Sequence, residues 1–455
     1  MKRLVAVAVV ALGLTAGLAA CGGGDKSGSG GESTTSAEAT EEATVSADDD
    51  NPAADPADAD DGNPAAGSYD CSDASQIQGE ITVWVDETRI TALQPAADLF
   101  CAEQGVKVNL IQKVFDDLRK DFASQVAAGS GPDITVGAND WLGEFKTNGL
   151  VAPIDLSGVA DQLSPAALGA FSSEGQAYGV PYGTENIALV RNNALISETK
   201  ATTFDELIEE GKAVGQKYSV IIPMGDAGDA YHMYPIQSSF GAEVFETDAE
   251  GDYTDTLAMG GEAGHKFAEY LAKLGQEGVV KSTITGDILG QAFTAGEVPY
   301  VITGPWNTST WVASGMDISV LPIPSAGGEP AAPFMGVQGF YLSAKAANAF
   351  DAETFLVDYL TRADVQLELY KLGGRMPANL EALADPSITD DPVAKGFAEA
   401  AGDAQVQPSI PAMNQVWSPW GLTEVAIADG KVTDPAAAWD EMITNIETAI
   451  AENAG

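Results

Sequence analysis

The chain has 455 residues, 45% of them hydrophobic, and its 22 Lys and Arg against 67 Asp and Glu give a formal net charge of −45. This length is enough for two domains with sizeable cores. The strong negative charge argues against nucleic acid and anionic membrane surfaces as partners. With only two histidines, the chain offers little for a His-based metal site or general-base chemistry, so we expect no metal and no cofactor.

The first 20 residues are typical of a lipoprotein signal peptide. Met1-Lys2-Arg3 is positively charged, and the apolar run 4–18 is shorter than the roughly 20 residues that a spanning helix needs. The run leads to Leu-Ala-Ala-Cys at 18–21, which resembles the lipobox of bacterial lipoproteins, where the cysteine is acylated. The alternative is ordinary signal cleavage with a coincidental cysteine. We expect an extracytoplasmic protein, lipid-anchored through Cys21 to the outer face of the cell membrane; a periplasm and a Gram-positive exterior both fit.

Residues 21–78 are predicted to hold the lipidated cysteine and a disordered acidic linker. The stretch is rich in Gly, Ser, Thr, Ala, Asp, Glu and Pro, so it cannot bury enough apolar surface to fold. Two further cysteines, Cys71 and Cys101, flank the start of the folded region. In an exported chain they are candidates for a disulfide, with two unpaired thiols as the alternative.

From residue 79, strands and helices alternate. Strands are predicted at 81–85, 106–112 and 134–137, and helices at 91–104 and 116–128, each helix ending at a glycine. The order βαβαβ predicts a parallel sheet covered on both faces. Because ligands bind beyond the carboxyl ends of such strands, the segments after Val85 and Val136 are candidate binding segments.

A second unit begins near Ile187. Thr203 and Glu206 have the spacing of a capping box and begin a predicted helix at 203–217. The remaining elements are a strand at 218–222, helices at 264–275 and 287–294, a strand at 299–303 and a mostly helical tail from about residue 351.

Several motifs occur in this chain in the same order as in one protein family. They are GEITVW (79–84), QVAAGSGPDI (125–134), GLVAP (149–153), AFTAGE (292–297), TGPW (303–306), PFMGV (333–337) and PSIPAM (408–413), followed by Trp417. Together they resemble the extracellular solute-binding proteins (family 1) of carbohydrate ABC transporters, in particular the maltose/maltodextrin-binding group. The resemblance implies an α/β, two-lobe periplasmic-binding-protein-like fold (type II), with a ligand cleft between the lobes and a hinge crossed more than once. Carried over, lobe one would be 79–187 plus 320–373, and lobe two 188–319 plus 374–455.

The resemblance also implies a saccharide site, in which aromatic rings cover apolar sugar faces and polar groups bond hydroxyls. The implied ligand-binding residues are Asp140, Trp141, Glu185, Asp229, Tyr231, Trp306 and Trp417, together with Glu87 and Arg89, where the alignment slips by one residue. Each aromatic could instead be a core residue, each acid a solvated or capping carboxylate, and Trp311 or Trp420 could replace Trp417. The chain departs from the family at Gly137, where the maltodextrin binder has a tryptophan, and we expect Trp141 to supply the missing ring.

The resulting hypothesis is the substrate-binding lipoprotein of an ABC importer that captures a maltodextrin-like oligosaccharide and delivers it to permease subunits by cleft closure. We expect a monomer that contacts the membrane only through its anchor. The main alternative is a binding protein for a non-glucan oligosaccharide, a polyol or a glycerol-phosphate compound. A glycoside-acting surface enzyme is more remote: a pair of carboxylates could be present, but no nucleophile elbow, zinc signature or phosphate-binding loop occurs. The sequence specifies neither which sugar is bound nor which permease receives it.

Overall fold

The computed structural model describes residues 69–249, 251–402 and 404–453. The predicted signal peptide, the lipidation site Cys21 and the linker up to residue 68 lie outside the described residues. None of the helices in the described ranges is both long and apolar enough to cross a membrane.

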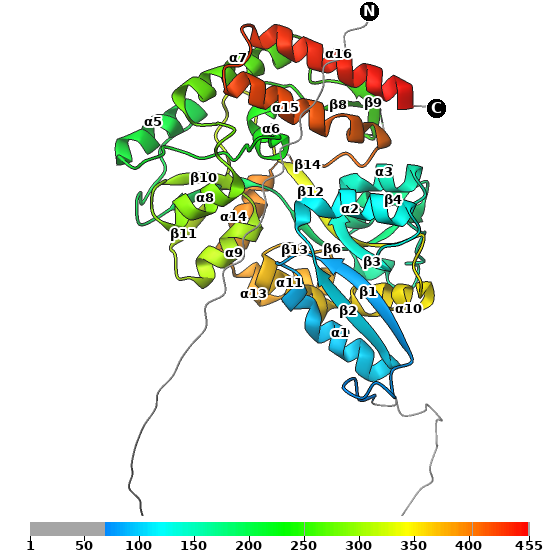
Figure 1. The fold of residues 1–455 in the computed structure, drawn as a ribbon. Helices are drawn as coiled ribbons and strands as arrows, with labels where there is room; N and C mark the ends of the chain where they lie inside the picture. Colours follow the sequence, from blue (N-terminus) through cyan, green and yellow to red (C-terminus); the bar gives the residue numbers. More distant parts are fainter. Residues whose placement is uncertain (1–68, 250, 403, 454–455) are drawn as a thin grey trace, which may run out of the picture. The chain divides into compact units, whose positions relative to one another are not determined.

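The first lobe is built on a seven-stranded mixed sheet (Figure 1). Its strands are β1 (Gly79–Val85), β2 (Val106–Gln112), β3 (Ile134–Ala138), β6 (Gly179–Glu185), β12 (Phe334–Leu342), β13 (Met376–Pro377) and β14 (Gln405–Val406). The order is β13-β6-β12-β3-β1-β2, with β14 paired to β12. β1 runs parallel to β2 and β3, which confirms the predicted βαβαβ unit, whereas β12 runs antiparallel to β3 and β6.

Helices pack on this sheet around one apolar core that includes Ile81, Val83 and Val85. They are α1 (Ile90–Gln104), α2 (Phe115–Ala127), α3 (Leu142–Thr147), α4 (Pro165–Ala170), α10 (Ala349–Thr354), α11 (Ala363–Gly373) and α12 (Leu380–Leu383). α1 ends at Gly105, whose φ of 70° is left-handed, as the glycine at this position predicts. A disulfide joins Cys71 to Cys101 in α1, so it ties the entering chain to the first helix.

The second lobe contains a three-stranded antiparallel sheet in the order β10-β7-β11. Its strands are β7 (Ala188–Asn192), β10 (Tyr300–Thr303) and β11 (Ile318–Leu321), and a separate hairpin is formed by β8 (Phe245–Thr247) and β9 (Tyr253–Leu257). The helices are α5 (Phe204–Val214), α6 (Ala230–Ser238), α7 (Gly261–Glu277), α8 (Gly286–Thr294), α9 (Pro305–Ala313), α14 (Pro392–Ala401), α15 (Trp417–Ala428) and α16 (Pro435–Asn453). The predicted capping box of Thr203 and Glu206 is present at α5.

One predicted strand of the second lobe is wrong. Residues 218–222 form no strand, and only Ile221 makes an isolated bridge, to Val301 of β10. Val220, Ile221 and Ile222 are nonetheless buried. Pro223 follows directly and has no N–H to extend a ladder, so the apolar run is buried without forming a strand.

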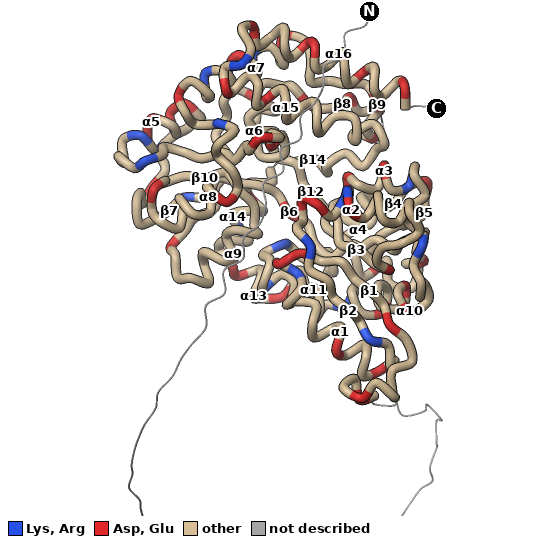
Figure 2. The backbone as a smooth tube through the Cα atoms, viewed as in Figure 1, with Lys and Arg blue, Asp and Glu red and all other residues tan. Residues whose placement is uncertain are grey.

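The chain passes between the two sheets more than once. β6 of the large sheet leads through Asn186 and Ile187 into β7 of the small one, and β11 leads back to β12. β13 and β14 pair in the large sheet, although both fall in the range predicted for lobe two. Asp and Glu residues occur along the backbone of both lobes (Figure 2).

Candidate ligand-binding site

A direct hydrogen bond joins residues of the two lobes at the predicted site. The indole Nε1 of Trp417, at the start of α15, donates to Oδ2 of Asp140 at 3.0 Å. Asp140 follows β3 in a short 3₁₀ turn (η1, Asn139–Trp141) and is only 5% exposed. The neighbouring Asn139 fixes this turn, because its amide donates to the carbonyl of Gln407 and accepts from the N–H of Val337.

Burial dominates the electrostatics of Asp140. It raises the pKa of this carboxyl from 3.8 to about 6, although the charge of Arg119 and the hydrogen bond from Trp417 act in the opposite direction. Asp140 is therefore an acid whose charge changes close to neutral pH, and it can either donate to a ligand hydroxyl or accept from one.

Tyr231, in the first turn of α6, lies between two other aromatic rings. Its ring centroid is 6.5 Å from that of Trp306 and 6.4 Å from that of Phe334. Its hydroxyl is buried and has no hydrogen-bond partner among the described residues. Burial and the charge of Glu185 raise the pKa of this hydroxyl. A Cβ built on Gly336 would lie 3.4 Å from Cγ of Glu185 and 3.6 Å from the Tyr231 hydroxyl, so these two groups approach the same stretch of β12 backbone.

Asp229 and His232 form a local pair beside Tyr231. Asp229 caps α6, since its Oδ1 accepts from the N–H of His232, and its Oδ2 lies 2.7 Å from Nδ1 of His232. The His232 ring meets Trp306 edge-on at 5.8 Å. Asp229 thus has a structural role as a cap, with its carboxylate next to two aromatic residues of the predicted site.

Trp417 differs in burial from Trp311 and Trp420, the two tryptophans that could replace it as a ligand residue. Trp420 and Trp311 are 0% and 4% exposed and belong to apolar cores. Trp417 is only partly buried and stacks on Trp420 with ring centroids 5.6 Å apart. Of these three tryptophans, only Trp417 combines partial exposure with a contact to the other lobe.

Trp141 lies in the core of the first lobe. It is 6% exposed and packs against Phe115 and Phe145 at 5.4 and 5.9 Å. A Cβ on Gly137 would overlap the Trp141 ring, so this ring fills the space that a side chain at 137 would need. The geometry therefore gives Trp141 a packing role, because its six-membered ring lies over the backbone of β3.

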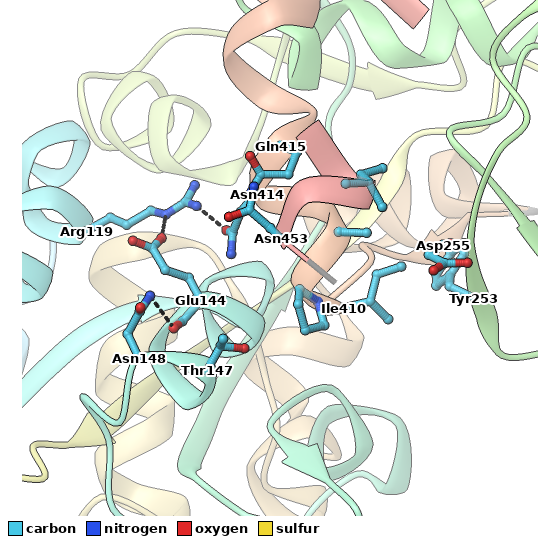
Figure 3. A pocket seen from close by; sticks show the side chains of 13 residues that line it. Arg119, Glu144, Thr147, Asn148, Tyr253, Asp255, Ile410, Asn414, Gln415 and Asn453 are labelled. Atoms are coloured by element: carbon cyan, nitrogen blue, oxygen red, sulfur yellow. Dashed lines mark hydrogen bonds and ion pairs between the residues drawn. The ribbon is translucent and has the colours of Figure 1, made fainter. Parts of the chain in front are cut away.

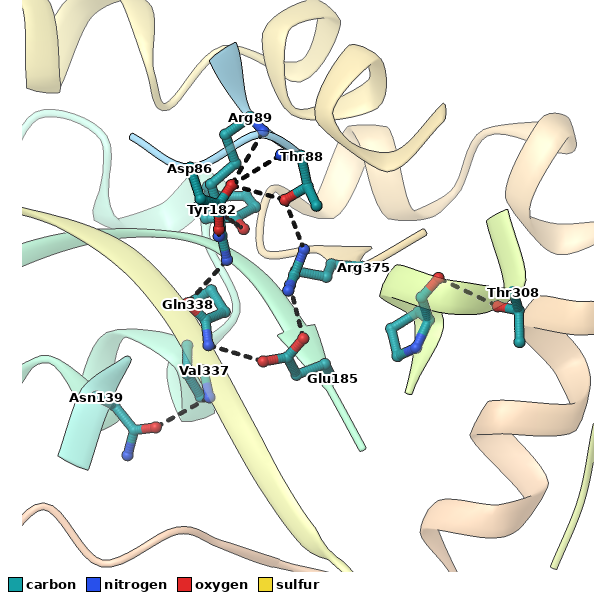
Figure 4. Close-up of polar contacts among 11 residues, drawn as sticks. Asp86, Thr88, Arg89, Asn139, Tyr182, Glu185, Thr308, Val337, Gln338 and Arg375 are labelled. Carbon is teal, nitrogen blue, oxygen red and sulfur yellow. Dashed lines mark hydrogen bonds and ion pairs between the residues drawn. The ribbon is translucent and has the colours of Figure 1, made fainter. Parts of the chain in front are cut away.

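Glu185, at the end of β6, belongs to a buried network of charged side chains (Figure 4). Its Oε2 accepts from Nε of Arg375 at 2.6 Å, and its Oε1 accepts from Gln338 at 2.7 Å. Arg89 is also in the network, since it donates to Gln338 and pairs with Asp86. Burial alone would raise the pKa of Asp86, but the charges of Arg89 and Arg375 hold it below its usual value. Glu87 is exposed and lies outside this network.

Sequence reasoning missed Arg375, Gln338 and Phe334. Arg375 is 7% exposed, and its guanidinium carbon lies 5.7 Å from the ring centroid of Trp306. The available signal was the pair of glycines before it: Gly374, with a φ of 71°, ends α11 and turns the chain toward Pro305. A glycine-terminated helix followed by a single arginine was too common a pattern to identify the residue.

A pocket of about 550 Å³ is lined by residues that include Arg119, Glu144 and Asn414 (Figure 3). None of the predicted ligand residues lines it. On one side Arg119 bonds Glu144 at 2.6 Å and also contacts Asn414, three residues before Trp417. This pocket therefore shares no residue with the predicted site, although the charge of its Arg119 acts on Asp140.

Residues 96–396 match the family model of the bacterial extracellular solute-binding proteins, which is more than half of the chain. The chain belongs to this family. Membership places this solute-binding protein outside the cytoplasm, as predicted, and the family is one of binding proteins.

Two relatives and one solved structure show how far the similarity of this solute-binding protein extends. The galactooligosaccharide-binding protein of Bacillus subtilis (strain 168) is 26% identical over 372 residues, 80% of this chain and 87% of that protein. The maltooligosaccharide ABC transporter solute-binding lipoprotein of Streptococcus pneumoniae (strain ATCC BAA-255 / R6) is 24% identical over 384 residues, 83% of this chain and 90% of that protein. The Thermus thermophilus maltotriose binding protein bound with maltotriose matches with a TM-score of 0.74 at 26% identity, covering 81% of this chain and 100% of that one. The predicted two-lobe fold is confirmed.

Proposed function

We propose that this protein is the substrate-binding lipoprotein of an ABC importer and that it captures a neutral oligosaccharide of the maltooligosaccharide class. The names of its relatives support both the transport role and the ligand class. One relative is named an ABC transporter solute-binding lipoprotein, and the relatives are named for binding maltooligosaccharide, maltotriose or galactooligosaccharide. The observation that carries the proposal is the buried Tyr231 hydroxyl, which has no partner among the described residues. An unpaired buried hydroxyl costs about 1–3 kcal/mol, and a ligand hydroxyl would satisfy it.

The surrounding side chains have the chemistry that a sugar requires. Trp306, Trp417 and Tyr231 offer aromatic faces for the apolar sides of the rings, and Asp140 and Glu185 offer oxygens for the hydroxyls. These side chains come from both lobes. A ligand that bonds Asp140 on one lobe and stacks on Trp306 of the other would hold the lobes together, and this closed form is what we propose the permease recognises.

The remaining parts of the proposal concern the location and partners of the protein. We infer that Cys21 is acylated and anchors a monomer to the outer face of the cell membrane. The relative from Streptococcus pneumoniae, which is named a lipoprotein, supports the anchor. We keep the lobe ranges 79–187 plus 320–373 and 188–319 plus 374–455 as proposals, except that residues 374–383, which include Arg375, β13 and α12, and the short strand β14 return to the first sheet.

A titration of intrinsic tryptophan fluorescence with maltotriose, a galactotriose, raffinose and glycerol phosphate tests the function. A saturable change with maltotriose supports the maltooligosaccharide class, and a response to galactotriose alone moves the proposal to galactooligosaccharides. Tyr231→Phe should weaken binding of the responding sugar about tenfold, since one hydrogen bond is worth about 1–1.5 kcal/mol. The control Tyr270→Phe, whose hydroxyl bonds Asp205 on the surface, should leave affinity unchanged. Silence with every sugar would contradict the proposal.

A further inference from the structure

The network around Glu185 is a closed ring of six side chains from elements far apart in the sequence (Figure 4). Arg375 bonds Glu185 and reaches the Thr88 hydroxyl at 3.4 Å, and Thr88 donates to Asp86 at 2.8 Å. From Asp86 the ring continues through Arg89 to Gln338, which donates back to Glu185. The register of β12 shifts between Gln338, which belongs to the ring, and Gly339.

The ring carries two negative and two positive charges and is therefore neutral. Asp86, Arg89, Glu185 and Arg375 are exposed by only 3%, 1%, 7% and 7%. At such burial, water screens charge poorly, and removing one member leaves an uncompensated charge that strongly affects any nearby ion. Oε2 of Glu185 lies 2.6 Å from Nε of Arg375, so the carboxylate offsets the charge of Arg375 where the two side chains meet.

Arg375 is the ring member that contacts the second lobe. Its guanidinium lies over Trp306, and a Cβ on the preceding Gly374 would lie 2.9 Å from the carbonyl oxygen of Pro305. This close backbone approach holds the arginine between Glu185 and the proposed stacking surface. Beyond the ring, Asp140 and Asp229, which the family resemblance implies at the ligand, are both acids.

We propose that the Glu185–Arg375 pair determines specificity by cancelling the positive charge of Arg375, so that the site accepts neutral saccharides and rejects those carrying carboxylate or phosphate groups. This inference rests on the proposed function and names the side chains that make its site select neutral saccharides. A hydroxyl can still bond either partner, because carboxylate oxygens and guanidinium groups each keep spare hydrogen-bonding capacity. An anion would meet the acids Asp140 and Asp229, while Arg375 is already paired with Glu185.

The test compares maltotriose with its analogue in which every C6 is oxidised to a carboxylate, by isothermal titration calorimetry at pH 7.5. Wild type should bind the oxidised sugar at least about 100-fold more weakly than maltotriose. Glu185→Gln frees Arg375, so this ratio should fall to below about tenfold, and the double variant Glu185→Gln/Arg375→Gln should restore it. A wild-type ratio below tenfold, or an unchanged ratio in Glu185→Gln, would overturn the proposal.

A second readout needs no sugar. At constant ionic strength set with chloride, 10 mM sulfate should raise the melting temperature of Glu185→Gln by roughly 3 °C and leave wild type and the double variant unchanged. An equal response in all three proteins overturns the inference. If the sulfate effect is selective but no saccharide binds, the pairing stands and the proposed function fails. If Glu185→Gln does not fold, Arg375→Gln provides the complementary test. Its unpaired Glu185 should weaken binding of the oxidised sugar, relative to maltotriose, about tenfold more than in wild type. An affinity ratio equal to that of wild type would overturn the proposal.

Discussion

Replacing Asp140 by Asn measures the free-energy cost of ionising this buried carboxyl, because the substitution leaves the packing of the side chain nearly unchanged. The variant keeps the shape of the side chain and an oxygen that can accept from Nε1 of Trp417, but it cannot ionise. In wild type, burial raises the pKa of Asp140 from 3.8 to about 6. The folded protein therefore binds this proton more tightly than the unfolded chain does, and the wild type loses stability as the pH rises through this range.

The magnitude follows from the two pKa values. Their difference of 6 − 3.8 is about 2 pKa units, and at 1.36 kcal/mol per unit the full penalty is about 3 kcal/mol above pH 6. At pH 4 most of that penalty is absent. We therefore expect the free energy of unfolding of Asp140→Asn, relative to wild type, to increase by about 2–3 kcal/mol between pH 4 and pH 8.

Urea denaturation of the purified proteins at pH 4, 5, 6, 7 and 8 measures this difference. Asp161→Asn, at an exposed position, is the control and should show no such trend. A constant offset between Asp140→Asn and wild type across the series would refute the reasoning, because it would mean that Asp140 does not titrate in this range. Weaker saccharide binding by the same variant would link the buried acid to the ligand.

Two further predictions concern stability elsewhere in the molecule. Replacing both Cys71 and Cys101 by Ser removes a cross-link between residues 30 apart and should lower the free energy of unfolding by about 2–4 kcal/mol; dithiothreitol should mimic this in wild type and have no effect on the variant. Glu424 is 0% exposed, its oxygens have no hydrogen-bond partner among the described residues, and burial and the charge of Asp229 raise its pKa well above 4.5. Since the folded-state pKa of Glu424 is raised, wild type should lose more stability than Glu424→Gln as the pH rises above 4.5. Parallel melting temperatures of the two proteins from pH 5 to pH 9 would contradict this.

Local signals in the sequence determined much of the fold. The glycine at 105 ends α1 because its backbone adopts a left-handed conformation at little cost, and the Thr203–Glu206 spacing begins α5 because both side chains bond free N–H groups at the helix start. The ordered motifs determined the family. These features depend on residues that are neighbours in the chain, so they can be read without the tertiary structure.

Only the tertiary structure decided which side chains meet. Glu185, Gln338 and Arg375 are more than 30 residues apart and are joined by the pairing of β6 with β12 and by the turn after α11. Trp141 and Trp417 are equally aromatic in the sequence, yet one lies in a core and the other is partly exposed at the meeting of the lobes. Burial and charge pairing are properties of contacts between distant segments, which residue type and local spacing do not specify.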